Sequence, residues 1–187
     1  MENPTNQEKM NIKVSLAEPD EAKSIQEVFY KTWVATYPNE EFEITVEDIE
    51  DKFKDALSEE RINKRIESIK NPPEGQTLFV AKEGNNVVGV CRAEKSEQGN
   101  RLRLIYVAPE FQGKGVGTLL WNEAKTVFDM SKDTFVDVVT YNTNAIKFYE
   151  KLGFEDTGKR FSDDRFTMKN GAKMPEMEMV IRGTQKI

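Results

Sequence analysis

The chain has 187 residues, of which 37% are hydrophobic and 32% are charged, and these proportions indicate one soluble domain with a sizeable core. Its net charge of −6 argues against nucleic acid as a partner, because phosphate binding needs a clustered basic surface. Histidine is absent, which excludes Ser–His–Asp and Cys–His catalysis and leaves zinc with almost no ligands, so no metal is expected.

Residues 1–10 are polar and lack the apolar core of a signal peptide, so we expect a disordered leader within a single domain spanning residues 1–187. No apolar run approaches the roughly 20 residues of a membrane span, and no membrane partner is expected. The single cysteine, Cys91, permits no internal disulfide, which agrees with a reducing, cytoplasmic location. Without a histidine to activate it, this thiol is expected to be buried and inert.

A short strand and a long helix are predicted first. Apolar residues alternate along residues 10–16, as in a strand with one buried face. Pro19 then stands at a first helical position, and apolar residues follow at helical spacing as far as Tyr37. Trp33 and Tyr37 lie on the apolar face of this helix, where aromatic side chains are most often part of the core.

Residues 45–70 predict two further helices. Thr45 and Asp48 form a helix-start pattern, and a second helical stretch begins at Ser58. Acidic residues are dense at the start of this region: Glu40, Glu41, Glu43, Glu47, Asp48, Glu50 and Asp51. They fit either a solvated helical face or a rim that attracts a polyamine or another cation.

Three consecutive antiparallel strands are predicted next. Residues 77–81 and 87–93 favour strands and are separated by a hairpin signal at residues 83–86. A polar turn over residues 94–100 is expected to lead into a central strand, residues 102–107.

A glycine-rich loop separates the central strand from an amphipathic helix. Gly113, Gly115 and Gly117 alternate, so backbone amides at the helix N-terminus can approach an anionic group closely. Lys114 adds a point charge, and the hydroxyl of Thr118 lies in the first helical turn, within reach of a phosphate. The spacing G-x-G-x-G fits neither the dinucleotide-binding pattern nor the Walker loop. The loop nevertheless has the form of a pyrophosphate cradle.

The C-terminal part predicts a strand over residues 134–140, a short helix, and a closing strand over residues 176–181. The first of these strands is expected to lie parallel to the central strand, because the amphipathic helix forms the crossover. Asn144 is expected to open the short helix and Gly153 to end it. Residues 161–173 are expected to form a hairpin-type connection.

Two motifs resemble those of the GNAT family of N-acetyltransferases. Val107, Pro109, Gln112, Gly115 and Gly117 match V-x-P-x-x-Q-x-x-G-x-G, the acyl-CoA binding segment of that family. Residues 144–154 match its second signature, N-x-x-x-x-Y-x-x-x-G-F, in the expected order. The resemblance covers residues 12–181. It implies an α/β fold with a mixed, mostly antiparallel central sheet, splayed between its fourth and fifth strands and flanked by helices.

The resemblance also implies acetyl-CoA as the acyl donor. The pantetheine arm would lie in the splay and pair like an extra strand with Tyr106 and Val107. The further donor contacts implied by position are Gln112, Gly113, Lys114, Gly115, Val116, Gly117 and Thr118. Asn144 would bind the pantetheine arm. Lys151 would reach the adenosine 3′-phosphate, or be a solvated helix lysine.

An amine is implied as the acceptor, and Trp33 and Tyr37 fall where many members of the family line the acceptor pocket. Homodimers are common in the family. Tyr149 is implied as the catalytic acid: a phenol with a pKa near 10 is matched to a departing thiol with a pKa near 8.5. The alternative for this ring is simple packing on the helix.

The general base has no assignment from the sequence. Some members of the family carry a glutamate where this chain has Arg101. Glu41, Glu43, Asp137 or a water held by backbone carbonyls all stay open. Three functions follow: an N-acetyltransferase that acts by direct attack of a small amine (polyamine-like included) or a peptide amine, an acyl-CoA sensor without turnover, or a nucleotide-binding protein of another fold.

Overall fold

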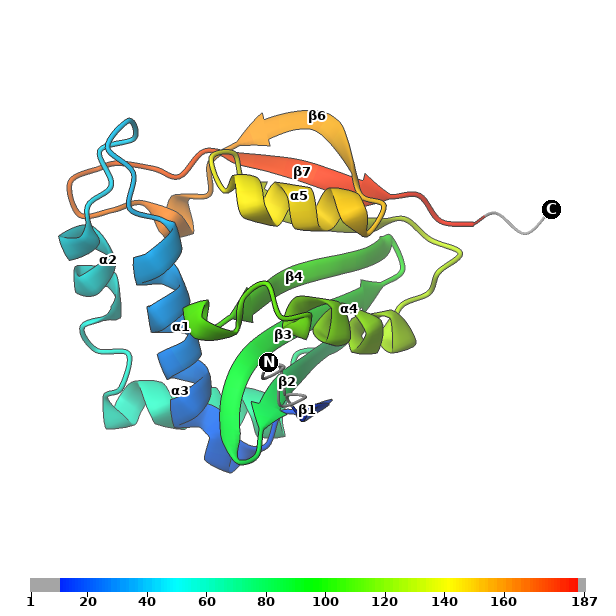
Figure 1. Ribbon diagram of the computed structural model, residues 1–187, viewed down its shortest axis with the longest axis horizontal. Coiled ribbons are helices and arrows are strands. Elements are labelled where there is room, and N and C mark those ends of the chain that lie inside the picture. Colours follow the sequence, from blue (N-terminus) through cyan, green and yellow to red (C-terminus); the bar gives the residue numbers. More distant parts are fainter. Residues whose placement is uncertain (1–10, 185–187) are drawn as a thin grey trace, which may run out of the picture.

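The computed structural model describes residues 11–184, so the expected leader, residues 1–10, lies outside the described part of the chain. That part contains one seven-stranded sheet with the order β1-β2-β3-β4-β5-β7-β6 (Figure 1). The strands are β1 (Ile12–Leu16), β2 (Gln76–Glu83), β3 (Asn86–Ser96), β4 (Gly99–Val107), β5 (Thr134–Val139), β6 (Glu155–Phe161) and β7 (Glu176–Ile181). The helices are α1 (Ala22–Thr36), α2 (Val46–Phe53), α3 (Glu59–Lys70), α4 (Val116–Val127) and α5 (Thr143–Lys151), with 3-10 turns η1 (Pro19–Glu21), η2 (Pro109–Phe111) and η3 (Asp164–Phe166).

The strand pairing confirms the predicted mixed sheet. β2, β3 and β4 pair antiparallel in sequence, and β4 then pairs parallel with β5 through the crossover helix α4. The remaining pairs, β1 with β2, β5 with β7 and β6 with β7, are antiparallel. A parallel neighbour needs a crossover long enough to hold a helix, and the segment between β4 and β5 supplies one.

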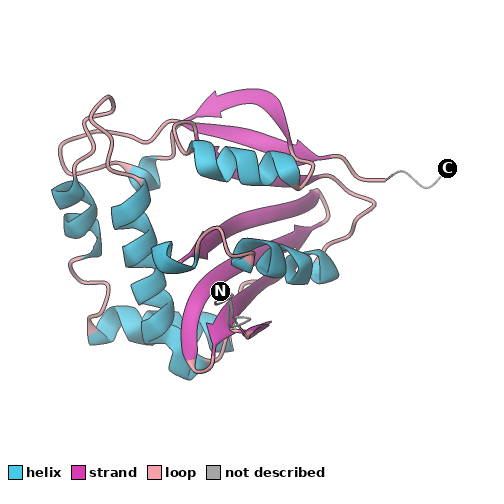
Figure 2. Ribbon diagram, viewed as in Figure 1, coloured by secondary structure: helices cyan, strands magenta, loops and turns pink. Residues whose placement is uncertain are grey.

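Helices cover both faces of the sheet because successive strand residues point to opposite sides. Phe79 and Ala81 of β2 pack in one cluster with Leu120 of α4. Val80, between them, packs on the other face with Ile25 of α1. Figure 2 shows α4 and α5 side by side in front of the strands, with the three N-terminal helices grouped at one side.

β4 and β5 separate after a short stretch of pairing. Their register covers only Asn100–Leu102 against Thr134–Val136. Beyond Leu102 and Val136 the two strands are no longer paired. This confirms the predicted splay between the fourth and fifth strands.

The closed end of the splay is held by a buried asparagine. The Asn100 side chain is 1% exposed. Its amide group donates to the Asp129 carbonyl at 2.8 Å and to the Thr134 hydroxyl at 3.1 Å, and its carbonyl oxygen accepts from the Asp129 backbone N–H at 3.0 Å. These bonds join the first residues of β4 and β5 to the loop after α4, so the strands begin together before they part.

Several helix boundaries confirm their sequence signals. α1 ends with Tyr37 as its C-terminal cap, and Ser58 caps α3 by accepting from the Arg61 N–H. Thr45 and Asp48 form the reciprocal capping box of α2. Gly153, with φ of 95°, follows the end of α5 in the left-handed conformation that favours glycine.

Three local predictions were wrong. Asn142, not Asn144, caps α5, because the Asn142 side chain accepts from the Ala145 N–H. The turn predicted over residues 94–100 is shorter, since β3 continues to Ser96 and β4 begins at Gly99. β6 was missed because its sequence, EDTGKRF, is polar and mostly exposed, as suits the edge of a sheet.

We predict that Asn100→Ala destabilises the fold by about 2–3 kcal/mol, because it leaves the Thr134 hydroxyl and two backbone groups of Asp129 without their buried partner. Urea unfolding measures the loss. Asn63→Ala, at an exposed position of α3, is the matched control. If Asn100→Ala lowers the free energy of unfolding by less than about 0.5 kcal/mol, the Asn100 hydrogen bonds do not stabilise the fold as predicted.

Candidate active site

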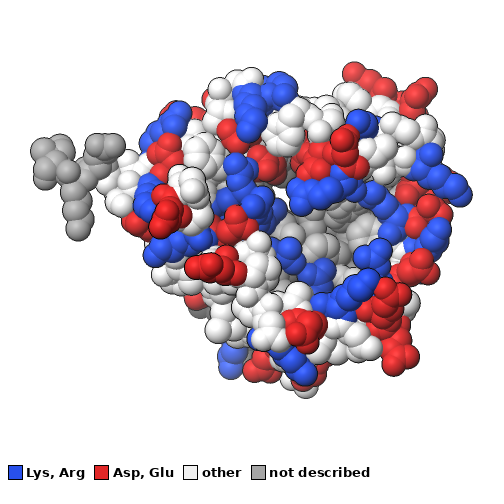
Figure 3. Space-filling model, turned by 180° about the vertical axis from the view of Figure 1, so that it is seen from behind, with Lys and Arg blue, Asp and Glu red and all other residues white. Residues whose placement is uncertain are grey.

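A cavity of about 980 Å³ opens where β4 and β5 separate. Its walls come from α1, β4, β5, α5 and the loop that precedes α4. Seen from the side opposite to Figure 1, the surface is hollowed, and lysine and arginine side chains gather around the hollow (Figure 3). All the site residues predicted from the sequence line this cavity except Lys114.

The loop before α4 presents free backbone amides. Gly113 and Gly115 have φ of 71° and 85°, the left-handed region that glycine adopts without strain. None of the described residues accepts a hydrogen bond from the backbone N–H groups of residues 113–117, whereas Thr118 and Leu119 both donate to the Gly115 carbonyl. Five donors at the positive end of a twelve-residue helix are therefore left for an anion.

Gly117 has a different role from the other two glycines. A side chain there would meet the Phe148 ring at 3.1 Å, whereas nothing lies within 4 Å of the corresponding positions at Gly113 and Gly115. Gly117 thus allows α4 to pack against α5. Lys114 is exposed and its ammonium lies 5.3 Å from the centre of the Phe111 ring, outside the cavity lining.

The end of β4 is tied to its neighbours through one carbonyl. The Val107 oxygen accepts from the Gln112 side-chain amide at 3.0 Å and from the Thr32 hydroxyl at 3.3 Å. Gln112 therefore orders the loop before α4 within the protein itself. The Tyr106 ring packs edge-on against Phe29 of α1, at 5.0 Å between ring centres.

Tyr149 projects from α5 into the core side of the cavity. It is 5% exposed and packs against the rings of Phe148 and Phe154. None of the described residues hydrogen-bonds to its hydroxyl. Burial raises the pKa of the Tyr149 phenol well above its ordinary value, so the group keeps its proton across the physiological range. Asn144 and Lys151 lie exposed on the same helix and also line the cavity.

Aromatic side chains of α1 form the opposite wall. Trp33 packs edge-on against Tyr37, at 4.9 Å between ring centres, and against Phe53 and Phe166. The Trp33 indole N–H is buried and has no hydrogen-bond partner among the described residues. The Tyr37 carbonyl accepts from the Tyr141 hydroxyl at 2.9 Å, which joins α1 to the end of β5.

The carboxylate that the sequence did not single out is Glu176, the first residue of β7. It is 7% exposed, lines the cavity, and one of its carboxylate oxygens has no hydrogen-bond partner in residues 11–184. Burial, reinforced by the charges of Asp137 and Asp163, raises the pKa of Glu176 to about 7. A sequence signal was present only weakly: Glu176 is a charged residue at the start of an otherwise apolar strand.

Of the carboxylates that the sequence left open as general base, only Asp137 lines the cavity. Asp137 lines the cavity, but both of its oxygens accept from the Arg101 guanidinium, at 2.9 and 2.8 Å. Glu41 and Glu43 do not line the cavity. Arg101, at the position where some family members carry glutamate, also pairs with Glu178 at 3.2 Å. The whole acidic segment, residues 40–51, is absent from the cavity lining.

Comparison with known protein families gives a match over most of the chain. A family model described as an acetyltransferase (GNAT) domain matches residues 26–180. The chain belongs to the GNAT acetyltransferase family.

Two curated relatives of this GNAT chain align with part of it. It is 32% identical over 66 residues to the peptidyl-lysine N-acetyltransferase YjaB of Salmonella typhimurium, an alignment that covers 35% of this chain and 43% of that protein. It is 35% identical over 80 residues to the uncharacterized N-acetyltransferase MJ1207 of Methanocaldococcus jannaschii, covering 42% and 34%. The chain therefore aligns with less than half the length of each relative.

Solved structures share the fold over nearly the whole chain. The PaiA N-acetyltransferase of Thermoplasma acidophilum, in complex with coenzyme A, matches with a TM-score of 0.70 at 20% identity, covering 92% of this chain and 99% of that one. The ribosomal-protein-S18-alanine N-acetyltransferase of Escherichia coli matches with a TM-score of 0.63 at 15% identity, covering 94% and 96%. At these identities the likeness shows the fold.

Cys91 is fully buried in β3, and burial raises the pKa of its thiol, as expected for an inert cysteine. Between residues 11 and 184, no three acidic or cysteine side chains are grouped so that they could hold a metal ion. Within the same range, no helix combines the length and the hydropathy needed to span a membrane.

The raised pKa of Glu176 predicts a pH-dependent stability. The folded carboxyl binds its proton more tightly than the unfolded one, whose pKa has the ordinary value of 4.5. The contribution of Glu176 to the free energy of unfolding therefore falls as the pH rises from about 4.5 to about 7. We expect Glu176→Gln to be more stable than wild type by about 1–3 kcal/mol at pH 8, with the difference vanishing near pH 4.5.

Urea unfolding at a series of pH values measures this difference. The control is Glu155→Gln, on the exposed edge strand β6, which should leave the pH dependence unchanged. A Glu176→Gln advantage that is the same at pH 4.5 and pH 8 would show that the carboxyl does not titrate in this window.

Proposed function

We propose that the protein is an acetyl-CoA-dependent N-acetyltransferase that transfers the acetyl group to a primary amine of a small molecule or peptide by direct attack. The observation that carries the proposal is the row of free backbone amides at residues 113–117, which borders the same cavity as Tyr149. Membership in the GNAT family supports it. The diphosphate of coenzyme A would bind these amides and the positive end of α4, and its pantetheine arm would follow β4 at Tyr106 and Val107.

Glu176 and Tyr149 are suited to the two proton transfers of the reaction, one from the amine and one to the departing sulfur. An ammonium must lose a proton before its nitrogen attacks the thioester carbonyl, and Glu176, with a pKa of about 7, is poised to accept one near neutral pH. As the C–N bond forms and the C–S bond breaks, the departing sulfur takes a proton from the Tyr149 phenol, and the attacking nitrogen gives its second proton to water as it becomes an amide nitrogen. Acetylated amine and free coenzyme A leave, and the phenol regains its proton from solvent as Glu176 releases its own.

Burial makes Tyr149 a weaker acid than a free phenol, which bears on its role. The group stays protonated until a thiolate forms beside it. A thiolate generated in a site with little water is a strong base, because desolvation disfavours its charge. The raised pKa of Tyr149 is therefore compatible with its proposed role as proton donor to the departing sulfur.

The alternative function, acyl-CoA binding without turnover, uses the same amides but needs neither Tyr149 nor Glu176. The two functions differ in one measurement, the release of free coenzyme A that depends on an added amine. A polyamine acceptor, which the acidic segment suggested, has little support, because none of those seven carboxylates lines the cavity.

We predict that Tyr149→Phe lowers kcat about 10²–10³-fold and leaves the affinity for coenzyme A within about twofold of wild type. Acetyl-dependent thiol release and calorimetric binding of coenzyme A measure the two quantities. Tyr30→Phe, on the exposed side of α1, is the matched control and should keep full activity. Equal kcat in Tyr149→Phe and wild type would remove the phenol from the mechanism.

A second prediction concerns Glu176. In wild type, kcat/KM should rise through a pKa near 7 as the carboxyl loses its proton, in addition to the rise that comes from the amine itself. In Glu176→Gln, the limb near pH 7 should disappear and kcat should fall about 10²-fold or more. Rate profiles from pH 5.5 to pH 9.5 for both proteins test this. Parallel profiles would assign the base to another group or to water.

A further inference from the structure

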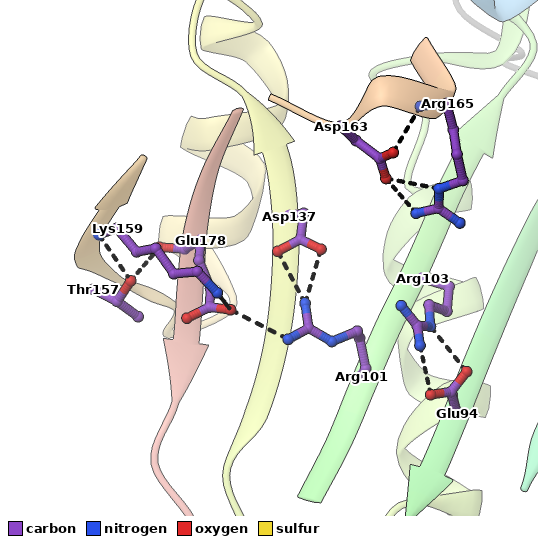
Figure 4. Close-up of polar contacts among 9 residues, drawn as sticks. All are labelled: Glu94, Arg101, Arg103, Asp137, Thr157, Lys159, Asp163, Arg165 and Glu178. Carbon is purple, nitrogen blue, oxygen red and sulfur yellow. Dashed lines mark hydrogen bonds and ion pairs between the residues drawn. The ribbon is translucent and has the colours of Figure 1, made fainter. Parts of the chain in front are cut away.

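Four of the charged side chains that line the cavity are paired with a neighbouring side chain of opposite charge, whereas Lys151 lies exposed at its edge. Arg103 donates to Glu94 at 2.9 and 2.7 Å, Arg165 pairs with Asp163, and Asp137 pairs with Arg101. Figure 4 shows these pairs: Arg103–Glu94 and Arg101–Asp137 lie on strands, and Arg165–Asp163 lies on the connection between β6 and β7.

Arg92 of β3 is different. It also lines the cavity, but none of the described residues lies within hydrogen-bond or ion-pair distance of its guanidinium. Burial lowers the pKa of Arg92, and the nearby charge of Arg103 lowers it further, as expected for a cation that has lost water without gaining a counterion.

The side chains around Arg92 are mostly cationic. Arg65, on α3, lies close enough for the two guanidinium groups to disfavour each other, and the pKa of Arg65 is lowered to about 10 by burial and by Arg92. Among the described residues, Arg65 donates to the neutral Gln26 amide, at 2.8 Å. The carboxylate that raises the pKa of Arg92 is Glu94, and both of its oxygens already accept from Arg103.

Space for a ligand group is present beside Arg92. A second pocket of about 80 Å³ is lined by Arg92, Gln76, Ser68 and the Pro72–Pro73 turn, and Gln76 and Arg92 line the main cavity too. The small pocket therefore adjoins the main cavity, and Arg92 borders both.

On the acidic side of the cavity, one carboxylate oxygen of Glu176 has no hydrogen-bond partner among the described residues. Glu176 and Arg92 line the same cavity, and Tyr106 lines it as well. The two groups therefore border one continuous space, which a single small molecule can occupy.

We propose, resting on the acetyltransferase function above, that the acceptor carries a carboxylate as well as its amine, and that Arg92 binds the carboxylate while the amine lies at Glu176. A guanidinium fork matches the two oxygens of a planar carboxylate, and one free fork suits that group better than a phosphate with three terminal oxygens and more charge. A polyamine would place an ammonium against Arg92, which like charges disfavour.

The test compares acceptors that differ only in the anionic group. The panel contains the common L-amino acids, β-alanine, 4-aminobutyrate and 5-aminovalerate, each beside its carboxamide, with phosphoethanolamine as the phosphate arm. Thiol release from acetyl-CoA gives kcat/KM for each. We expect the best carboxylate to exceed its own amide at least tenfold. Amides that equal or exceed their carboxylates, or a preference for phosphoethanolamine, would overturn the proposal.

Variants assign the effect to Arg92. Arg92→Gln should raise KM for the best carboxylate about 10- to 100-fold and leave KM for its amide and for acetyl-CoA unchanged. Arg92→Lys keeps the charge but loses the guanidinium fork, so its KM for the best carboxylate should lie between those of wild type and Arg92→Gln. Arg61→Gln, exposed on α3, is the matched control. Because Arg92 has no partner to lose, Arg92→Gln should keep or raise the melting temperature. An equal loss on carboxylate and amide would contradict a carboxylate subsite.

Binding without turnover separates this proposal from the function on which it rests. Each compound of the panel is added to the complex of the protein with coenzyme A, and the melting temperature of the complex is measured for wild type and for Arg92→Gln. If carboxylates stabilise this complex through Arg92 but nothing is acetylated, the subsite stands and the acetyltransferase function fails. If amides or simple amines are acetylated and carboxylates are not, the function stands and the subsite fails. If neither occurs, both fail.

Discussion

The structure depends on one interrupted pairing in its sheet. β4 and β5 share only three residue pairs, anchored by Asn100, and then separate. A strand that loses its neighbour leaves backbone donors and acceptors without partners, and such groups must be satisfied by other means. At Val107 the protein does this with the side chains of Thr32 and Gln112. The cavity exists because the remainder of this edge is not closed by another strand.

The two sides of the cavity use different kinds of recognition. On the α4 side, backbone amides and a helix terminus form the binding surface, and glycines keep it open. This surface can grip a diphosphate with little dependence on side chains. On the α1 and β7 side, aromatic rings, Glu176 and Arg92 form the wall. The donor side thus depends mainly on the backbone, whereas the proposed acceptor side depends on individual side chains.

Burial acts on the two proposed catalytic groups in the same direction with different consequences. It raises the pKa of Tyr149 and of Glu176, because both are charged when they lose a proton. For the phenol, this keeps the proton in place until a strong base forms. For the carboxyl, a pKa of about 7 leaves it able both to accept and to release a proton near neutral pH. One physical effect thus suits Tyr149 to the proposed role of acid and Glu176 to the proposed role of base, in a chain without histidine.

By itself, the sequence determined local features: the glycine loop, the cap of α2 and the aromatic face of α1. It indicated the splayed α/β fold only indirectly, because two short motifs resemble those of a known family. These signals lie within a dozen residues, where turn geometry and helical spacing act directly. Tertiary structure alone decided that Gly117 packs against Phe148 and that Asp137 is tied to Arg101. It also decided that one oxygen of Glu176 and the Arg92 guanidinium have no partner within residues 11–184. Whether a charge is neutralised depends on strands far apart in the chain, and no pattern in the sequence records that distance.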